Sequence, residues 1–188
     1  MKRIIALLLT SVLISGCASM IGAVKEEPIR EDNGNRTTGS YVDDELIEIK
    51  AIVNIGKGSQ DLRNSHVNIT SFNGVVLISG QVASEPTRQE AESIVSQVRK
   101  IRRIHNELTI TSPTSSLTRA SDTWITAKIK ANMLGDDRVD ATRIKVVTEN
   151  GVVYLMGLVS QQEADDAINL VRTVNGIQKI VKIFEYIN

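Results

Sequence analysis

Few side chains in this sequence have the types and spacing that catalysis needs. The 188 residues include one cysteine, Cys17, and two histidines, His66 and His105. A serine or cysteine nucleophile needs a base beside it, and neither Ser79 nor Ser84 lies in the Gly-x-Ser-x-Gly turn of hydrolases. A cysteine-based zinc site would need further cysteines. We therefore predict no catalytic residue, no metal and no cofactor.

Two carboxylate pairs, Asp136–Asp137 and Asp165–Asp166, are the remaining candidates for acid–base chemistry. They fall at expected loop or helix-start positions, where solvated charge is the favoured interpretation. Gly74 and Gly80 flank an expected strand and precede no helix directly, unlike a phosphate-binding loop. The 22 lysines and arginines balance the 22 aspartates and glutamates, which argues against nucleic-acid binding. These features predict a protein that is not an enzyme.

The chemistry that the sequence does support is lipid modification of Cys17. Lys2 and Arg3 precede an almost uninterrupted apolar run from Ile4 to Ile14. This run is shorter than the roughly 20 residues that span a bilayer, and it is typical of a signal-peptide core. It ends in Ile14-Ser15-Gly16-Cys17, which resembles a bacterial lipobox. The cysteine would then carry a diacylglycerol and an N-acyl chain; the alternative is a secreted protein with an incidental cysteine.

The predicted anchor leads to a predicted location. We expect residues 1–16 to be a cleaved signal peptide and residues 17–41 to be an acylated N-terminus and flexible tether. Three acyl chains anchor firmly where a single chain anchors only marginally. Ser19 is not the aspartate that tends to keep lipoproteins at the inner membrane. The motif therefore implies lipid anchoring in the cell outer membrane, on its periplasmic face.

The elements after the tether are present twice. Ser65–Thr70 aligns with Thr142–Val147, and Asn73–Gly80 aligns with Asn150–Gly157, at a spacing of 77 residues in both cases. Each copy reads as helix, strand, strand, helix, strand. The sequence therefore predicts a first domain over residues 42–111, a linker over 112–119 and a second domain over 120–188.

Each copy is predicted to be an α/β domain of the α+β type, with a three-stranded mixed sheet covered by two helices. The Asn-Gly pairs predict tight hairpin turns between the first two strands. First helices are expected over Asp44–Ile55 and Asp122–Leu134, with Ser121 or Asp122 as an N-cap. The order of the strands stays open. Five glycines are interpreted as residues that the fold requires: Gly74, Gly80, Gly151, Gly157 and Gly176.

These motifs resemble the BON domain, named for bacterial OsmY and nodulation proteins. The resemblance rests on Asp122, Ile125 and Ile129, on Gly151–Gly157, and on Val174–Ile177. The first copy matches at Gly74–Gly80 and departs where Lys100 replaces the glycine found at Gly176. For a lipid-anchored protein with two such domains, the resemblance implies that the second domain binds anionic phospholipid in the inner leaflet of the outer membrane. It also implies a role in envelope integrity and cell division.

One surface is the candidate lipid-binding site. Ile125, Ile129 and Met133 recur every four residues and should face the sheet. A second stripe of the same helix carries an amphipathic tryptophan and a cation, a combination suited to lipid headgroups. Its residues are Trp124, Ala127, Lys128, Ala131 and Leu134. The alternative is that Trp124 packs against the first domain or the linker.

Two further interpretations concern partners. A basic cluster, Arg99, Lys100, Arg102 and Arg103, is interpreted as cations near the negative end of the second helix. The strand Ile104–Ile110 could accept a strand from another protein. The alternative function is therefore a protein adaptor for an outer-membrane assembly or peptidoglycan-remodelling partner. We expect the chain itself to be a monomer.

Overall fold

The computed structural model describes residues 34–187. The predicted signal peptide, Cys17 and the predicted tether up to residue 33 lie outside the described residues. The described residues belong to one compact unit. No helix within residues 34–187 is long and apolar enough to cross a membrane.

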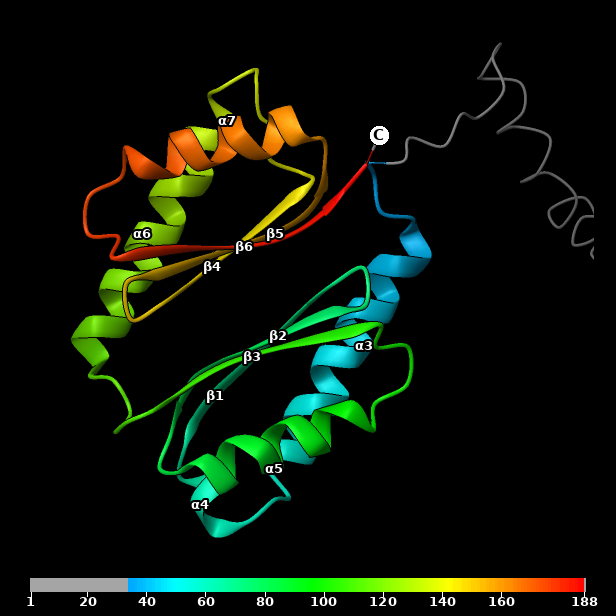
Figure 1. Ribbon diagram of the computed structural model, residues 1–188, viewed down its shortest axis with the longest axis vertical. Helices are drawn as coiled ribbons and strands as arrows, with labels where there is room; N and C mark the ends of the chain where they lie inside the picture. Colours follow the sequence, from blue (N-terminus) through cyan, green and yellow to red (C-terminus); the bar gives the residue numbers. More distant parts are fainter. Residues whose placement is uncertain (1–33, 188) are drawn as a thin grey trace, which may run out of the picture. The chain divides into compact units, whose positions relative to one another are not determined.

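The two repeats fold in the same order of elements (Figure 1). The first repeat contains α3 (Thr38–Ile55), α4 (Gln60–Arg63), β1 (His66–Phe72), β2 (Val75–Val82), α5 (Glu85–Ser96) and β3 (Arg103–Ile110). The second contains α6 (Ser116–Leu134), β4 (Ile144–Glu149), β5 (Val152–Val159), α7 (Gln161–Arg172) and β6 (Lys179–Tyr186). The short helix α4 was not expected from the sequence and has no counterpart in the second repeat.

Each repeat builds a mixed three-stranded sheet, which confirms the predicted fold class. The strand orders are β1-β2-β3 and β4-β5-β6, so β2 and β5 are the central strands. Each central strand pairs antiparallel with the strand before it and parallel with the strand after it. The hairpin turns are those predicted, since Asn73 and Gly74 have φ of 51° and 74°, and Asn150 and Gly151 have 49° and 72°.

The first helix of each repeat starts earlier than the sequence predicted. Helix α6 begins at Ser116, and its N-cap is Ser115, whose hydroxyl accepts a hydrogen bond from the backbone N–H of Thr118 at 3.1 Å. The expected N-cap at Ser121 or Asp122 is therefore wrong, and residues 116–119 of the predicted linker are helical. Helix α3 likewise includes Thr38–Tyr41, which the sequence placed in the tether.

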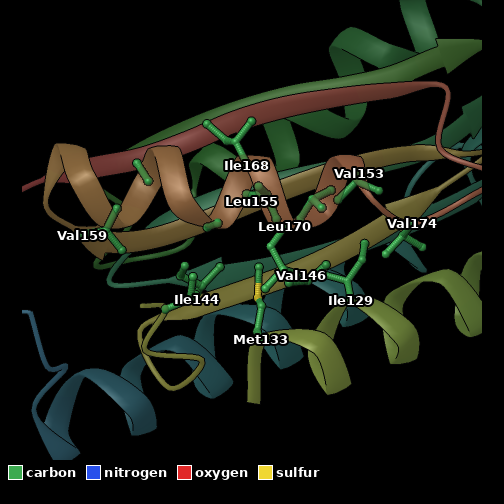
Figure 2. Close-up of a cluster of buried hydrophobic side chains, with 14 of the residues drawn as sticks. Ile129, Met133, Ile144, Val146, Val153, Leu155, Val159, Ile168, Leu170 and Val174 are labelled. Atoms are coloured by element: carbon green, nitrogen blue, oxygen red, sulfur yellow. The ribbon is translucent and has the colours of Figure 1, made fainter. Parts of the chain in front are cut away.

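The helices of each repeat cover one face of its own sheet. In the second repeat, Ile129 and Met133 of α6 reach toward Val146, Leu155 and Leu170 (Figure 2). A corresponding cluster in the first repeat is centred on Ile47, Ala51, Ile78 and Val95. These two clusters leave the opposite face of each sheet without a helix.

Those opposite faces pack against each other (Figure 1). A third apolar cluster joins side chains of β1 and β2 to side chains of β5 and β6. Its buried members are Phe72, Val75, Leu77, Tyr154, Met156 and Ile183. Every residue of β2 is buried as a result. The two repeats therefore share a core, although the sequence predicted two separate domains.

Candidate functional site

The outer side of α6 carries a continuous apolar stripe. Leu117 is 79% exposed, Trp124 is 58% exposed and Leu134 is 77% exposed. Ala120, Ala127 and Ala131 are also exposed and lie between them at three- and four-residue spacing. The α6 stripe, as we call these six residues, therefore runs from the first turn of the helix to the last. The predicted alternative, in which Trp124 packs against the first domain or the linker, is wrong because more than half of Trp124 is exposed.

The inner side of α6 fixes the orientation of this stripe. Ile125, Ile129 and Met133 are 2%, 0% and 1% exposed, which confirms that they face the sheet. Asp122 lies one turn earlier on the same side and is 6% exposed. Its carboxylate accepts hydrogen bonds from the backbone N–H groups of the Asn150–Gly151 turn at 2.7 and 2.9 Å. A change on the outer side of α6 therefore leaves these inner contacts in place.

Cations lie on both sides of the α6 stripe. Lys128 is exposed and follows Trp124 by one helical turn. Lys130 lies on another side of α6, in an open groove of about 520 Å³ that also includes Arg119 and His66. A helix with an apolar stripe, an exposed tryptophan and flanking lysines has the composition of a helix that lies in a membrane interface.

The glycines interpreted as fold residues occupy the crowded or left-handed positions expected of them. At Gly80, which has φ of 122°, a Cβ atom would lie 2.0 Å from the carbonyl oxygen of His66. At Gly157 it would lie 2.5 Å from the carbonyl oxygen of Arg143. Close approach of β1 to β2 and of β4 to β5 therefore excludes a side chain at these two positions. Lys100 of the first repeat stands where the second repeat has Gly176. Lys100 adopts φ of 73°, so the left-handed backbone geometry is kept without glycine.

The basic cluster does not lie at the end of a helix. Helix α5 ends at Ser96 and has no basic residue in its last turn. Lys100 instead forms an ion pair with Asp43 at 2.6 Å, and Arg102 forms one with Glu185 of the second repeat at 2.7 Å. The interpretation as cations at a helix end is therefore wrong for these two residues.

The other residues considered for chemistry are not brought together. No group of three or more histidines, cysteines, aspartates and glutamates within residues 34–187 could hold a metal ion. His66 lies 3.6 Å from the carboxylate of Glu149, and His105 lies on β3. Asp136 pairs with Arg138 at 2.6 Å, which holds the pKa of Asp136 at about 2 and keeps it ionised.

Sequence reasoning missed two features of the exposed surface. Leu117 was missed because α6 was expected to start after it, although the Ser115-x-x-Thr118 segment carries a capping signal. The outer side of α3 was missed as well. Six large apolar side chains of α3 are between 44% and 57% exposed: Tyr41, Val42, Leu46, Ile49, Ile52 and Val53. They could have been found from their spacing, because four of them repeat at intervals of four, three and four residues.

Comparison with known proteins identifies the repeat. Residues 44–112 and 121–188 each match the model of the BON domain. The chain is 33% identical over 191 residues to the outer membrane lipoprotein DolP of Haemophilus influenzae, covering 100% of this chain and 97% of that protein. It is 33% identical over 152 residues to a 21 kDa hemolysin of Actinobacillus pleuropneumoniae, covering 81% of this chain and 78% of the hemolysin. It is 28% identical over 189 residues to the osmotically-inducible protein Y of Escherichia coli, covering 95% and 92%.

Proposed function

This chain belongs to the BON-domain family, and from that premise we propose that it is an outer-membrane lipoprotein whose second BON domain binds anionic phospholipid. The single observation that carries the lipid-binding proposal is the exposed α6 stripe with Trp124 at its centre and Lys128 beside it. The name of the Haemophilus relative, an outer membrane lipoprotein, and the lipobox at Cys17 support the location. The proposal extends to support of outer-membrane integrity at the division site, on the family resemblance alone.

The chemistry of the α6 stripe sets the mode of binding. The helix would lie in the plane of the inner leaflet, with Trp124 among the headgroups and Leu117 and Leu134 at the two ends of the contact. Lys128 would contact a phosphate, contributing on the order of 1 kcal/mol near an anionic surface. Burial of one large apolar side chain adds about 1.5–3 kcal/mol at most. The bare domains should therefore bind weakly, and the anchor at Cys17 would raise the local concentration of membrane.

A protein adaptor is the second candidate, and one observation favours it. The strand β3 lies at the edge of its sheet and pairs only with β2 among the described strands. Ile110 at its end is 52% exposed. A strand from an outer-membrane assembly or peptidoglycan-remodelling protein would add to this edge.

The two candidates are separated by vesicle flotation of the unacylated chain, residues 18–188. Keeping the residues before α3 matters because Thr37 caps that helix and Arg36 forms an ion pair with Asp44 at 2.8 Å. We expect flotation with vesicles rich in phosphatidylglycerol and none with phosphatidylcholine. Trp124→Glu should abolish flotation, whereas Tyr186→Glu, at an aromatic residue of similar exposure (52%), should not. Equal flotation of the Trp124→Glu chain would exclude α6 as the lipid site.

A further inference from the structure

The outer side of α3 carries a second apolar stripe, unrelated to the lipid-binding proposal. Val42, Leu46, Ile49 and Val53 are 55%, 44%, 57% and 49% exposed. Their spacing of four, three and four residues is that of the d and a positions of a heptad repeat. The residues of α3 that face its own sheet are Asp44, Ile47, Ala51 and Ile55. The four exposed residues, which we call the α3 stripe, therefore form a helical seam without a partner in the described part of the chain.

Charge separates the α3 stripe from the α6 stripe. Helix α3 carries four acidic side chains and one lysine: Asp43, Asp44, Glu45, Glu48 and Lys50. Such a helix offers an anionic lipid surface no net positive charge, whereas α6 presents Lys128 beside its stripe. A row of exposed apolar side chains on one side of a helix is a feature of association sites. The α3 stripe therefore suits a protein surface and not the lipid headgroups.

The charged residues of α3 also indicate which protein would bind to the α3 stripe. Three of its acids are neutralised within the chain: Asp43 by Lys100 at 2.6 Å, Asp44 by Arg36 at 2.8 Å and Glu48 by Lys145 at 2.7 Å. Glu45 and Lys50 form no ion pair with any residue in 34–187. These two residues lie on opposite flanks of the α3 stripe, five positions apart.

We propose that α3 pairs in parallel with α3 of a second copy of this chain. In the heptad frame of this stripe, Leu46 and Val53 occupy a positions, and Val42 and Ile49 occupy d positions. Glu45 then occupies a g position, and Lys50 occupies the e position that follows it. Residues at g and the next e′ are neighbours across a parallel pair of helices, where they form interhelical ion pairs. Glu45 of each copy therefore faces Lys50 of the other, twice by symmetry. An antiparallel pair would place glutamate beside glutamate and lysine beside lysine.

The position of α3 in the chain fits the parallel arrangement. Helix α3 follows the predicted tether, so in two anchored copies the N-terminal end of each α3 would be the end joined to the membrane, which a parallel pair allows. The helix has 18 residues, which gives only two heptads of contact and weak pairing in free solution. Confinement to a membrane raises the effective concentration and favours pairing there. For the anchored chain, this proposal departs from the monomer that the sequence led us to expect. This step rests on the proposed anchor, but the pairing of Glu45 with Lys50 does not.

Cysteine cross-linking of the full chain in Gram-negative membranes tests the orientation. Val42→Cys and Val53→Cys should each form a disulfide with the same residue of a second copy under mild oxidation. In an antiparallel pair, the two copies of residue 42 would lie about 16 Å apart, and so would the two copies of residue 53, since a helix rises 1.5 Å per residue. A disulfide needs Cα atoms within about 7 Å of each other. The unchanged chain, whose one cysteine is Cys17, gives the background. Gln89→Cys, at an exposed position of α5, is the matched control and should not exceed it.

Charge exchange tests the pairing itself in the Val42→Cys background. Glu45→Lys and Lys50→Glu should each lower the dimer yield several-fold, and the two changes together should restore it. Both side chains are exposed, so circular dichroism should be unchanged. Three outcomes would overturn the proposal: dimer yields no higher than for Gln89→Cys, cross-links of Val42→Cys only to Val53→Cys in mixed membranes, or cross-links to a different protein. Failure of the double exchange to restore the dimer would overturn the predicted ion pair and the parallel register with it.

Discussion

Asp122 accepts a hydrogen bond from the backbone N–H of Gly151 at 2.9 Å and so ties α6 to the turn between β4 and β5. Asp44 makes the same contact with Gly74 at 2.9 Å in the first repeat. Both carboxylates are buried, at 6% and 2% exposure. Each repeat therefore holds its first helix on its hairpin with a buried acid, in addition to apolar packing.

We predict that Asp44 makes the stability of the fold depend on pH. Burial alone would raise its pKa, but four hydrogen bonds outweigh burial and lower the pKa below its usual value; the donors are Gly74, Ser71, Asn73 and Arg36. A lowered folded-state pKa adds stability above the unfolded carboxyl pKa of about 3.9. That stability is lost as the pH falls through the folded pKa.

The substitution Asp44→Asn should therefore cost about 1–3 kcal/mol at pH 7 and less at pH 3. Urea unfolding at both pH values measures the difference. Asp43→Asn is the matched control, because Asp43 makes an exposed pair with Lys100 that is worth less than about 1 kcal/mol. Equal losses for Asp44→Asn at pH 7 and pH 3 would contradict the assignment.

The parts of the fold that could be predicted from sequence are those set by local chemistry. The Asn73-Gly74 and Asn150-Gly151 pairs specify tight turns wherever the flanking strands lie. The four-residue spacing of Ile125, Ile129 and Met133 identified the buried side of α6, and so its exposed side as well. These inferences needed no knowledge of the rest of the chain.

The parts that were missed depend on contacts between the repeats or on competing caps. Ser121 and Asp122 look like an N-cap, but Ser115 lies earlier and the residues between can all be helical. The shared core was missed although β2 reads as an almost continuous apolar run, Val75–Ile78, instead of an alternating one. Such a run indicates a strand covered on both faces, and the second cover is the other repeat.

We predict that Glu149 holds the two repeats together. Its carboxylate is 7% exposed and accepts hydrogen bonds from the side-chain amides of Asn68 at 2.8 Å and Gln81 at 2.9 Å, both in the first repeat. Glu149→Ala leaves the Gln81 amide buried without an acceptor, which should cost about 1–3 kcal/mol. Chemical denaturation measures this change in the free energy of unfolding. Asp137→Ala, at an exposed position, is the control and should change the free energy of unfolding by close to zero. A Glu149→Ala chain as stable as the control would show that the sheets pack without this link.

We predict that Gly80→Ala and Gly157→Ala damage folding before any binding. The added Cβ would lie 2.0 and 2.5 Å from backbone carbonyl oxygens, and only main-chain movement relieves such contacts. We expect losses of about 3 kcal/mol or more, at the upper end for single substitutions. Gly135→Ala is the control, since its nearest atoms would be 3.7 Å away, and it should change stability by less than about 0.5 kcal/mol. Thermal melts rank the three variants, and similar melting temperatures for all three would contradict the predicted clash.

We predict that Cys17→Ala removes the membrane anchor. The variant should lose labelling by radioactive palmitate and should appear in the soluble periplasmic fraction or as an uncleaved precursor. This follows from the Ile14–Cys17 motif, because the sulfur of Cys17 is the proposed attachment atom. Palmitate incorporated into the Cys17→Ala protein would show that the acyl chains are attached elsewhere.

We predict finally that the two ends of the α6 stripe contribute to lipid binding and that the α3 stripe does not. Leu117 and Leu134 are 79% and 77% exposed, so replacing either by serine removes apolar contact with lipid and leaves the core unchanged. Each change should weaken binding to phosphatidylglycerol vesicles about tenfold, corresponding to about 1.4 kcal/mol. Lys128→Gln should weaken binding mainly at low salt, because screening already reduces the contribution of an exposed cation at high salt. Val42→Ser on α3 is the matched control and should bind as the unchanged chain does. If Val42→Ser loses as much binding as Leu117→Ser, the membrane-facing surface includes the first domain, and the separation of the two stripes into a lipid surface and a protein surface is wrong.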